Sequence, residues 1–362
     1  MGKVFDGYSN CRVIEEEHNG IDITHVPVLP RGSNAVSRLI SYHHYPLSAK
    51  RYVNGLEKEF DVVFSNQSSP VMMVEPALEY AKKWGKRVVM YCMDLWPASL
   101  CVGGIKKESP IYKYYWKVSK RIYENVDIIL ITSRSFKKYF VTEFGIPENK
   151  IDYLPQYATT QFENLPKQSN VKKETTDFVF AGNVGAAQNL EIILKAAKII
   201  ADERVTDHGK EIKFHIIGNG QSLGYLQNYA ERESITNVIF HGRKPPEDMP
   251  GYYMMADAML VTMIPDKLVS LTLPAKVQSY MAAGKPILAS ADGEIASVIK
   301  ESMCGFCAKA DDEKALKDRI EDFINLQNRE QLGENARKYY LDNFSAGLVM
   351  DKLETILREN CR

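Results

Sequence analysis

The stretch LTLPAKVQSYMAAGKPILAS, Leu271 to Ser290, predicts a short helix that leads directly into a buried strand. Pro274 suits the first turn of the helix, apolar side chains recur on one face, and Gly284 suits the C-terminal cap. Pro286 then restarts the chain as a strand from Ile287 to Ala289. A helix followed by a buried strand is the repeating unit of α/β folds, so this stretch indicates the fold class.

A lysine stands in the first turn of this predicted helix, where the helix dipole disfavours a cation. The cost for Lys276 is a few tenths of a kcal/mol, unless an anion also lies at the exposed N–H groups and reverses the sign. The stretch is therefore a candidate half of a phosphate site. The alternative interpretation is a solvated lysine that stretches away from the end of the helix.

The same alternation of short apolar strands and longer helical segments runs through most of the chain. It predicts parallel sheets wrapped by helices, in two α/β halves. The strand patterns are DVVFS, RVVMYCM and DIILIT in the first half, and DFVFAG, KFHIIG, NVIFHG, AMLVTM and PILAS in the second. The polar segment QFENLPKQSNVKKETT is the predicted linker between the halves, and the pattern is helical from Asp311 onward.

Composition excludes several classes of protein. The 362 residues are 45% hydrophobic and 25% charged, with 46 Lys and Arg against 46 Asp and Glu, so no overall field attracts nucleic acid. Six cysteines in a chain of this length form no disulfide framework, and the lone C-x-x-C at Cys304 and Cys307 favours core packing over metal binding. No apolar run can span a bilayer and no signal-peptide pattern opens the chain, so we expect a cytoplasmic protein.

Glycine-rich turns follow three consecutive strand patterns of the second half. They are Gly182-Asn183-Val184-Gly185, Gly218-Asn219-Gly220 and Gly242-Arg243-Lys244. Ligands gather beyond the carboxyl ends of the strands in open α/β sheets, although each turn alone is more typical of tight backbone geometry. None matches a Walker or dinucleotide motif. The three turns together with Lys276 predict a phosphate-bearing ligand in the second half.

Two features of the first half are candidates for function. Asp94, in MYCMDLWPAS, directly follows a buried strand, and it is either a turn or N-cap residue or an active-site carboxylate. In IYKYYWKVSKRIYE, a helical arrangement places Ile111, Tyr115, Val118 and Ile122 in a core stripe and Lys113, Lys117 and Lys120 opposite, with Tyr112, Trp116 and Tyr123 between. Aromatic side chains beside a lysine stripe suit a membrane interface, and an ordinary surface helix is the other interpretation.

Five segments resemble the retaining glycosyltransferases of family four, which have the GT-B fold of two Rossmann-like domains facing across a cleft. They are FAGNVGAAQNL, FHIIGNG, FHGR, PAKVQSYMAAGKPIL and, in the first half, DLWP. The chain looks most like the branch that builds capsule, O-antigen and other bacterial surface polysaccharides. The resemblance implies an acceptor-side domain at residues 1–165, to which residues 346–362 cross back, and a nucleotide-sugar-binding domain at residues 166–345.

The resemblance also implies substrates and roles for residues. A nucleotide diphosphate sugar, UDP-linked, would bind the second domain, and a lipid-linked or saccharide acceptor would bind the first, with peripheral contact to the inner face of the plasma membrane. Lys276 would face the diphosphate together with the N–H groups from Thr272 onward and the turn from Gly182 to Gly185. Backbone near Gly242 and Arg243 would read the base. Asp94 would act on the acceptor, and with no D-x-D motif present we expect neither a metal nor a cofactor.

Two departures from the family pattern shape these expectations. The wider family carries two glutamates eight positions apart, and aligned on Gly284 the corresponding positions are Leu271 and Ser279. Ser279 would take the ribose contact, with Glu294 as a weaker candidate. The start of the chain looks like an interior stretch of the family, so its first strand, glycine loop and helix are expected to be absent. The alternative function is therefore a nucleotide-sugar-binding protein without transfer activity, either truncated or a partner subunit.

Overall fold

The computed structural model describes residues 8–9, 11–30, 35–165 and 173–361. The chain forms two compact units, the first made of Met1–Thr132, Phe136–Leu154 and Lys352–Arg362, and the second of Ser133–Ser135 and Pro155–Asp351. The expected domain boundary between residues 165 and 166 lies at the edge of a segment outside the described residues, and it stays a prediction. No helix in the described ranges has the length and apolar character needed to cross a membrane.

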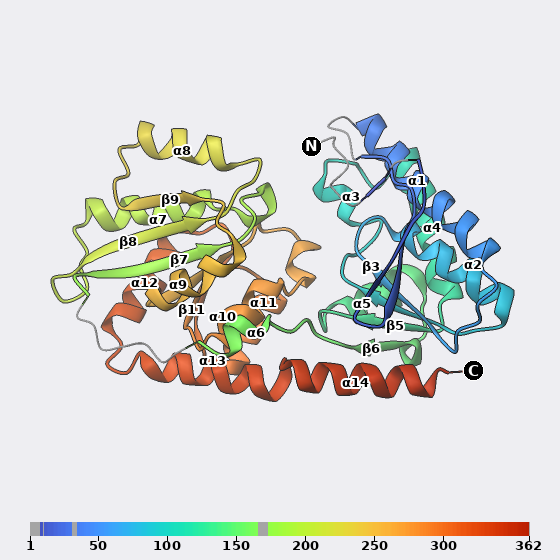
Figure 1. Cartoon of the computed structure of the whole chain (residues 1–362). Coiled ribbons are helices and arrows are strands. Elements are labelled where there is room, and N and C mark those ends of the chain that lie inside the picture. The colour runs from blue at the N-terminus through green and yellow to red at the C-terminus, as the bar shows by residue number, and fades with distance from the viewer. Residues whose placement is uncertain (1–7, 10, 31–34, 166–172, 362) are drawn as a thin grey trace. The chain divides into compact units, whose positions relative to one another are not determined.

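The first unit is built on a four-stranded parallel sheet of order β3-β4-β5-β6, and a separate antiparallel hairpin pairs β1 with β2 (Figure 1). Its elements are β1 Ile14–His18, β2 Ile21–His25, α1 Ala35–Gly55, β3 Val63–Gln67, η1 Val71–Val74, α2 Glu75–Trp84, β4 Val88–Cys92, α3 Ser99–Val102, α4 Pro110–Asn125, β5 Ile128–Ile131, α5 Phe136–Phe144, η2 Glu148–Lys150 and β6 Ile151–Tyr153. The expected absence of a first strand and helix from this unit stays a prediction.

Helix α4 shows how local sequence sets an element of the first unit. Ser109 caps it by accepting a hydrogen bond from the Tyr112 N–H at 3.2 Å, and Pro110 occupies the first helical position. The buried face consists of Tyr112, Tyr115, Ser119, Ile122 and Tyr123. The predicted core stripe was therefore wrong at Ile111, which is exposed, and only partly right at Val118, which is half-buried. Tyr112 and Tyr123, which were predicted to lie between the two faces, are buried instead.

The second unit contains a six-stranded parallel sheet of order β12-β11-β10-β7-β8-β9. Its elements are α6 Thr160–Glu163, β7 Thr175–Ala181, η3 Ala186–Gln188, α7 Glu191–Asp202, β8 Glu211–Ile217, α8 Leu223–Arg232, β9 Val238–Gly242, η4 Pro246–Asp248, α9 Met249–Met255, β10 Ala258–Thr262, η5 Val269–Leu271, α10 Ala275–Ala282, β11 Ile287–Ser290, α11 Glu294–Ser302, β12 Gly305–Ala308, α12 Glu313–Asn325, α13 Glu330–Asn343 and α14 Ala346–Glu359, whose last residues count with the first unit.

The strand order of the second unit locates its binding edge. Chain order runs outward from β7 to β9 on one side and from β10 to β12 on the other, which is the doubly wound arrangement of a Rossmann-like domain. The direction of winding reverses between β7 and β10, and ligands of such sheets bind at the carboxyl ends of the strands beside this switch point. A ligand site is therefore expected at the turn after β7 and the segment after β10.

One face of this sheet is fixed by an aromatic and aliphatic core. Phe178 stacks on Phe214 with ring centroids 5.5 Å apart, and both belong to a buried cluster that includes side chains of α7, α8 and α12. The predicted linker at residues 161–176 was only partly correct. Its first residues lie in α6, where buried Phe162 stacks on Tyr253 at 4.3 Å between ring centroids, and its last two begin β7. Phe162 thus anchors the start of this polar segment, although the composition of the segment predicts an unattached linker.

Candidate functional site

The three glycine turns of the second unit lie together at the carboxyl ends of β7, β8 and β9. Backbone hydrogen bonds join them, because the Gly182 N–H donates to the Ile217 carbonyl at 2.9 Å and the Gly218 N–H donates to the Gly242 carbonyl at 2.8 Å. The Val184 N–H likewise donates to the Asn219 carbonyl at 3.0 Å. The N–H groups of Gly182 and Val184 therefore hold the first turn against the second and are not open to a ligand.

Gly218 is the position where this close approach requires glycine. Its φ is +145°, and a Cβ built on it would lie 1.8 Å from the Gly182 carbonyl oxygen. No side chain could occupy that space without separating the first two turns. The glycines therefore allow two loops to approach within backbone contact, and they do so at the edge of the sheet where ligands of this fold bind.

A cavity of about 410 Å³ opens at these turns. Its lining includes residues of the three predicted turns, namely Gly182, Asn183, Gly218, Asn219, Arg243 and Lys244, and also residues that sequence patterns did not indicate, namely Phe162, Ala181, Ile217, Met249 and Tyr253. Small apolar walls with a few polar groups and two cations are typical of a small-molecule site. Gly185, Gly220 and Gly242 belong to the same turns but not to the lining.

Lys276 lies beside the Gly182 turn, as the sequence predicts for a phosphate site. Its Nζ is 3.2 Å from where a Cβ of Gly182 would stand, lies 3.9 Å from the centroid of the Phe180 ring, and donates to Gln188 Oε1 at 2.6 Å. Burial lowers the pKa of Lys276 to about 7. The interpretation as a solvated lysine is therefore wrong. An ammonium held among neutral groups is poised to pair with an anion.

The N-terminus of α10 presents backbone donors next to this ammonium. Helix geometry leaves the first N–H groups, those of Ala275 and Lys276, without acceptors inside the helix, and Pro274 at the N-cap adds no side-chain cap. The Thr272 N–H is not available in the same way, since it donates to the Val269 carbonyl at 3.0 Å. The predicted donor set therefore begins after Thr272 and not at it.

The two candidates for the ribose contact differ in their surroundings. Ser279 is half-buried on α10, one turn beyond Lys276, and its Oγ donates to the Ala275 carbonyl at 3.2 Å. Glu294 is buried at the start of α11, where its carboxylate accepts from the Ser135 N–H at 3.1 Å and from the Ser135 hydroxyl, and lies 3.3 Å from Arg134 Nε. Both oxygens of Glu294 are thus engaged away from the cavity lining, which leaves Ser279 as the better placed candidate.

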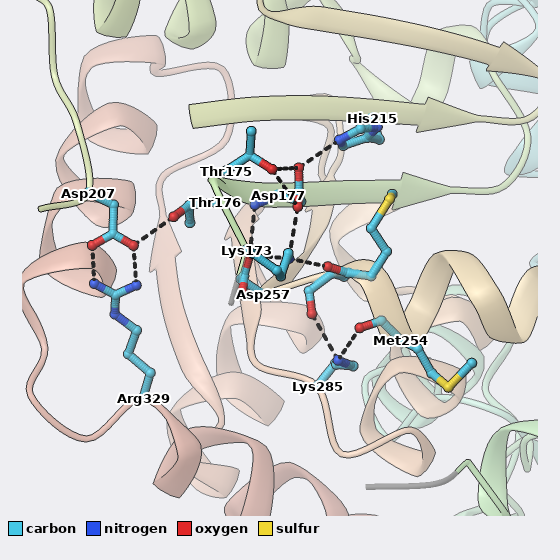
Figure 2. Close-up of polar contacts among 12 residues, drawn as sticks. Lys173, Thr175, Thr176, Asp177, Asp207, His215, Met254, Asp257, Lys285 and Arg329 are labelled. Atoms are coloured by element: carbon cyan, nitrogen blue, oxygen red, sulfur yellow. Dashed lines mark hydrogen bonds and ion pairs between the residues drawn. The ribbon is translucent and has the colours of Figure 1, made fainter. Parts of the chain in front are cut away.

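A buried polar network fixes the helix that carries two of the lining residues. Figure 2 shows Lys173 and Lys285 at the C-terminal end of α9, where their ammonium groups donate to the carbonyls of Met255 at 2.5 Å and Ala256 at 2.8 Å. Cations at a helix C-terminus are favoured by the helix dipole. Because Met249 and Tyr253 of α9 line the cavity, the two lysines help to fix its wall.

The same network crosses the sheet. Asp177 pairs with Lys173 at 2.8 Å and accepts from His215 at 3.0 Å, and the second nitrogen of His215 contacts His241 Nε2 at 2.9 Å. Burial opposes ionisation of Asp177, but its hydrogen bonds to His215 and Lys173 lower its pKa to about 2. Burial lowers the pKa of His241, so this ring next to the Gly242 turn favours its neutral form.

Asp94 lies in the first unit, directly after β4, in a loop that is held from several sides. Trp96 is buried, its indole N–H donates to Ser69 Oγ at 2.8 Å, and its carbonyl accepts from Tyr123 at 3.0 Å and Tyr139 at 3.2 Å. Burial raises the pKa of Asp94, and hydrogen-bonding groups that include the Ser69 hydroxyl limit the rise. A half-buried carboxylate on a rigid loop is suited to act on a bound hydroxyl group.

Metal ligands are not gathered at either candidate site. Within the described ranges, no three His, Cys, Asp or Glu side chains lie together in a way that could hold a metal ion. Cys304 is buried and Cys307 half-buried, and both are free thiols. The expectation that neither metal nor cofactor takes part stays a prediction.

Family comparisons cover nearly the whole described chain. Residues 9–158 match the model for Glycosyltransferase Family 4, and residues 161–339 match the model for Glycosyl transferases group 1. The probable glycosyltransferase WbjE of Pseudomonas aeruginosa is 25% identical in an alignment 313 residues long that covers 82% of this chain and 74% of WbjE. The lipopolysaccharide 1,2-N-acetylglucosaminetransferase of Salmonella typhimurium is 24% identical in an alignment 243 residues long that covers 63% of this chain and 61% of that protein.

Solved structures agree with the fold. The Anabaena protein Alr3699/HepE, crystallised in complex with UDP-glucose, superposes with a TM-score of 0.66 at 13% identity, over 92% of this chain and 86% of that chain. At this identity the similarity concerns the fold alone, and it is that of two Rossmann-like domains with parallel sheets. The chain therefore carries a Glycosyltransferase Family 4 domain and a Glycosyl transferases group 1 domain, which are domains of the GT-B superfamily, and it has homologues in the synthesis of surface polysaccharides.

Proposed function

We propose that the chain transfers a sugar from a UDP-linked sugar to a lipid-linked or saccharide acceptor during synthesis of capsule, O-antigen or exopolysaccharide, with retention of configuration. The observation that carries this proposal is the half-buried ammonium of Lys276 beside the Gly182 turn. Its hydrogen-bond partner in the described part of the chain is neutral Gln188, and its second neighbour is the Phe180 ring. A cation placed in this way at the switch point of a Rossmann-like sheet suits a diphosphate.

The chemistry follows from where negative charge develops. When the bond between the sugar and the diphosphate breaks, charge accumulates on the departing phosphate oxygens. The Lys276 ammonium and the open N–H groups at the start of α10 would stabilise that charge, and the low local dielectric would strengthen their effect. Lys276 thus has both a binding and a catalytic role in this proposal.

The donor and the acceptor are supported in different ways. A structural neighbour with the same fold was crystallised with UDP-glucose, and a relative is a lipopolysaccharide N-acetylglucosaminetransferase. Both observations favour a nucleotide sugar as donor and a glycan as acceptor. Ser279 would contact the ribose, and the Gly242 and Arg243 backbone would contact the base. Retention rests on the resemblance to family four.

Asp94 is the proposed acceptor-side residue. Its carboxylate would orient the attacking hydroxyl group of the acceptor or accept its proton. Burial raises the pKa of Asp94, which makes the carboxylate a stronger base than a solvated aspartate. The rigid support by Trp96 and Ser69 would hold it in place.

We also propose that the lysine face of α4 contacts an anionic membrane surface. Lys113 and Lys117 are exposed there, and next to them lies the aromatic side chain of Tyr114, which is 53% exposed. Exposed cations beside an aromatic side chain suit a lipid headgroup region. Such a contact would bring the enzyme to a lipid-linked acceptor.

A panel of nucleotide sugars tests the proposed function. Each would be incubated with the protein, and both the rise in melting temperature and the release of UDP or another nucleotide would be measured. We expect protection and slow hydrolysis with at least one UDP-sugar, and transfer when a suitable acceptor is added. Protection without hydrolysis or transfer would favour the alternative, a binding protein without activity. No protection by any nucleotide would contradict both.

A further inference from the structure

Gln188 is the side chain that holds the Lys276 ammonium in place. Its Oε1 accepts from Lys276 Nζ at 2.6 Å, which is a short contact for a charge-assisted hydrogen bond. The two residues are far apart in sequence, because Gln188 follows β7 and Lys276 begins α10. Nothing in the sequence pattern of either segment indicates this contact.

The backbone of Gln188 is fixed across the switch point of the sheet. Its carbonyl accepts from the Thr262 hydroxyl at 2.5 Å, and its N–H donates to the Gly185 carbonyl at 3.0 Å. Thr262 is fully buried at the end of β10, so the bond joins the turn after β7 to the neighbouring strand on the other side of the reversal. A residue anchored at both backbone groups presents its side chain in a defined position.

The direction of the amide follows from hydrogen-bond chemistry. A lysine ammonium can only donate, so the atom of Gln188 that meets it must be the oxygen. The amide nitrogen then has two N–H donors, and within the described residues no acceptor in the chain takes them. Because the side chain is only half-buried, these donors are accessible to a ligand in the site.

We propose that Gln188 is a positioning and specificity residue of the donor site: Oε1 holds the Lys276 ammonium, and Nε2 donates to an oxygen of the donor's diphosphate. This inference rests on the proposed function. A glutamine can serve both partners at once because one end of its amide accepts and the other donates. A carboxylate in its place would pair more strongly with Lys276 but would repel the diphosphate.

The test compares Gln188→Glu and Gln188→Met with the parent protein in calorimetric titrations with UDP, and with uridine at millimolar concentration. We expect Gln188→Glu to weaken UDP binding at least tenfold and Gln188→Met to weaken it several-fold, with uridine binding unchanged in both. Gln227→Glu is the matched control, because it adds the same charge at an exposed position of α8 and should not change UDP affinity.

A second readout separates positioning from simple structural support. The carboxylate of Gln188→Glu would raise the pKa of Lys276, so the fall of UDP affinity between pH 7 and pH 9 should become smaller in this variant than in the parent. Parent-like UDP affinity in Gln188→Glu, or an equal loss of uridine binding, would overturn the inference while leaving the proposed function standing. Failure of the parent itself to bind UDP would overturn both.

Discussion

The pH dependence of donor binding follows from the burial of Lys276. Burial lowers the pKa of this residue to about 7 in the ligand-free site, whereas a bound diphosphate would favour the charged form and raise it. Binding therefore takes up a proton at alkaline pH. Affinity should be highest at and below pH 7 and should fall as the pH rises above the pKa of the free site.

The size of the change in UDP affinity follows from the pKa of Lys276. At pH 9 an amine with a pKa of about 7 is roughly 1% protonated, against about half at pH 7. If the bound form keeps its proton over this range, UDP affinity should drop about 50-fold, or roughly 2.3 kcal/mol. Titration of UDP itself adds little to this change in affinity between pH 7 and pH 9. Its terminal phosphate has a second pKa of about 6 and is therefore already ionised at pH 7.

The variant Lys276→Arg tests whether Lys276 causes the fall of UDP affinity with rising pH. An arginine stays protonated up to pH 9 and beyond, so its UDP affinity should vary little between pH 7 and pH 9, even if it is weaker throughout. Burial also lowers the pKa of Lys285, to about 8, and the variant keeps that residue, so any effect of Lys285 appears in both proteins. The assay is isothermal calorimetry with UDP at both pH values. An equal fall of UDP affinity in parent and variant, or no fall in the parent, would show that the protonation of Lys276 does not control UDP binding.

Three further predictions concern other parts of the molecule. Asp94→Asn should keep the UDP affinity of the parent but lower sugar transfer about 100-fold or more, since it removes the proposed base, and transfer at the parent rate would make Asp94 a turn residue. Replacing Lys113, Lys117 and Lys120 with glutamate should release the protein from anionic vesicles in sedimentation without changing its melting temperature, and equal sedimentation would count against the membrane contact. Gly218→Ala should lower the melting temperature by roughly 5 °C or more, because the added methyl group would meet a carbonyl oxygen at 1.8 Å, and an unchanged melting temperature would contradict the close approach of the turns.

Much of the second unit could be predicted from local sequence, because buried parallel strands are short apolar runs that end in glycine turns. The stretch from Leu271 to Ser290 forms the predicted helix and strand, with α10 at Ala275–Ala282 and β11 at Ile287–Ser290. Strands β1 and β2 were not predicted, because their side chains are mostly exposed and carry no apolar pattern. Strand β12, at Gly305–Ala308, is too short to stand out.

The candidate site was predictable only in part. The glycine turns and Lys276 could be predicted, because the spacing of the glycines and the position of the lysine at a helix start depend on only a few neighbouring residues. Gln188 and Phe180 could not be linked to Lys276 from sequence, because their contacts form only when the turn after β7 meets the start of α10. Glu294 was predicted as a candidate for the ribose contact from its residue type and position in the sequence. Its carboxylate instead contacts Arg134 and Ser135, and local sequence does not reveal these contacts.

A structure of the protein with UDP bound would show whether Lys276 and the start of α10 hold the diphosphate. We expect oxygens of the diphosphate to lie within hydrogen-bonding distance of Lys276 Nζ and of the open N–H groups at the start of α10, with the uridine in the cavity lined by Gly182, Gly218 and Tyr253. UDP bound elsewhere on the chain, with Lys276 still held by Gln188 and free of phosphate contact, would contradict it.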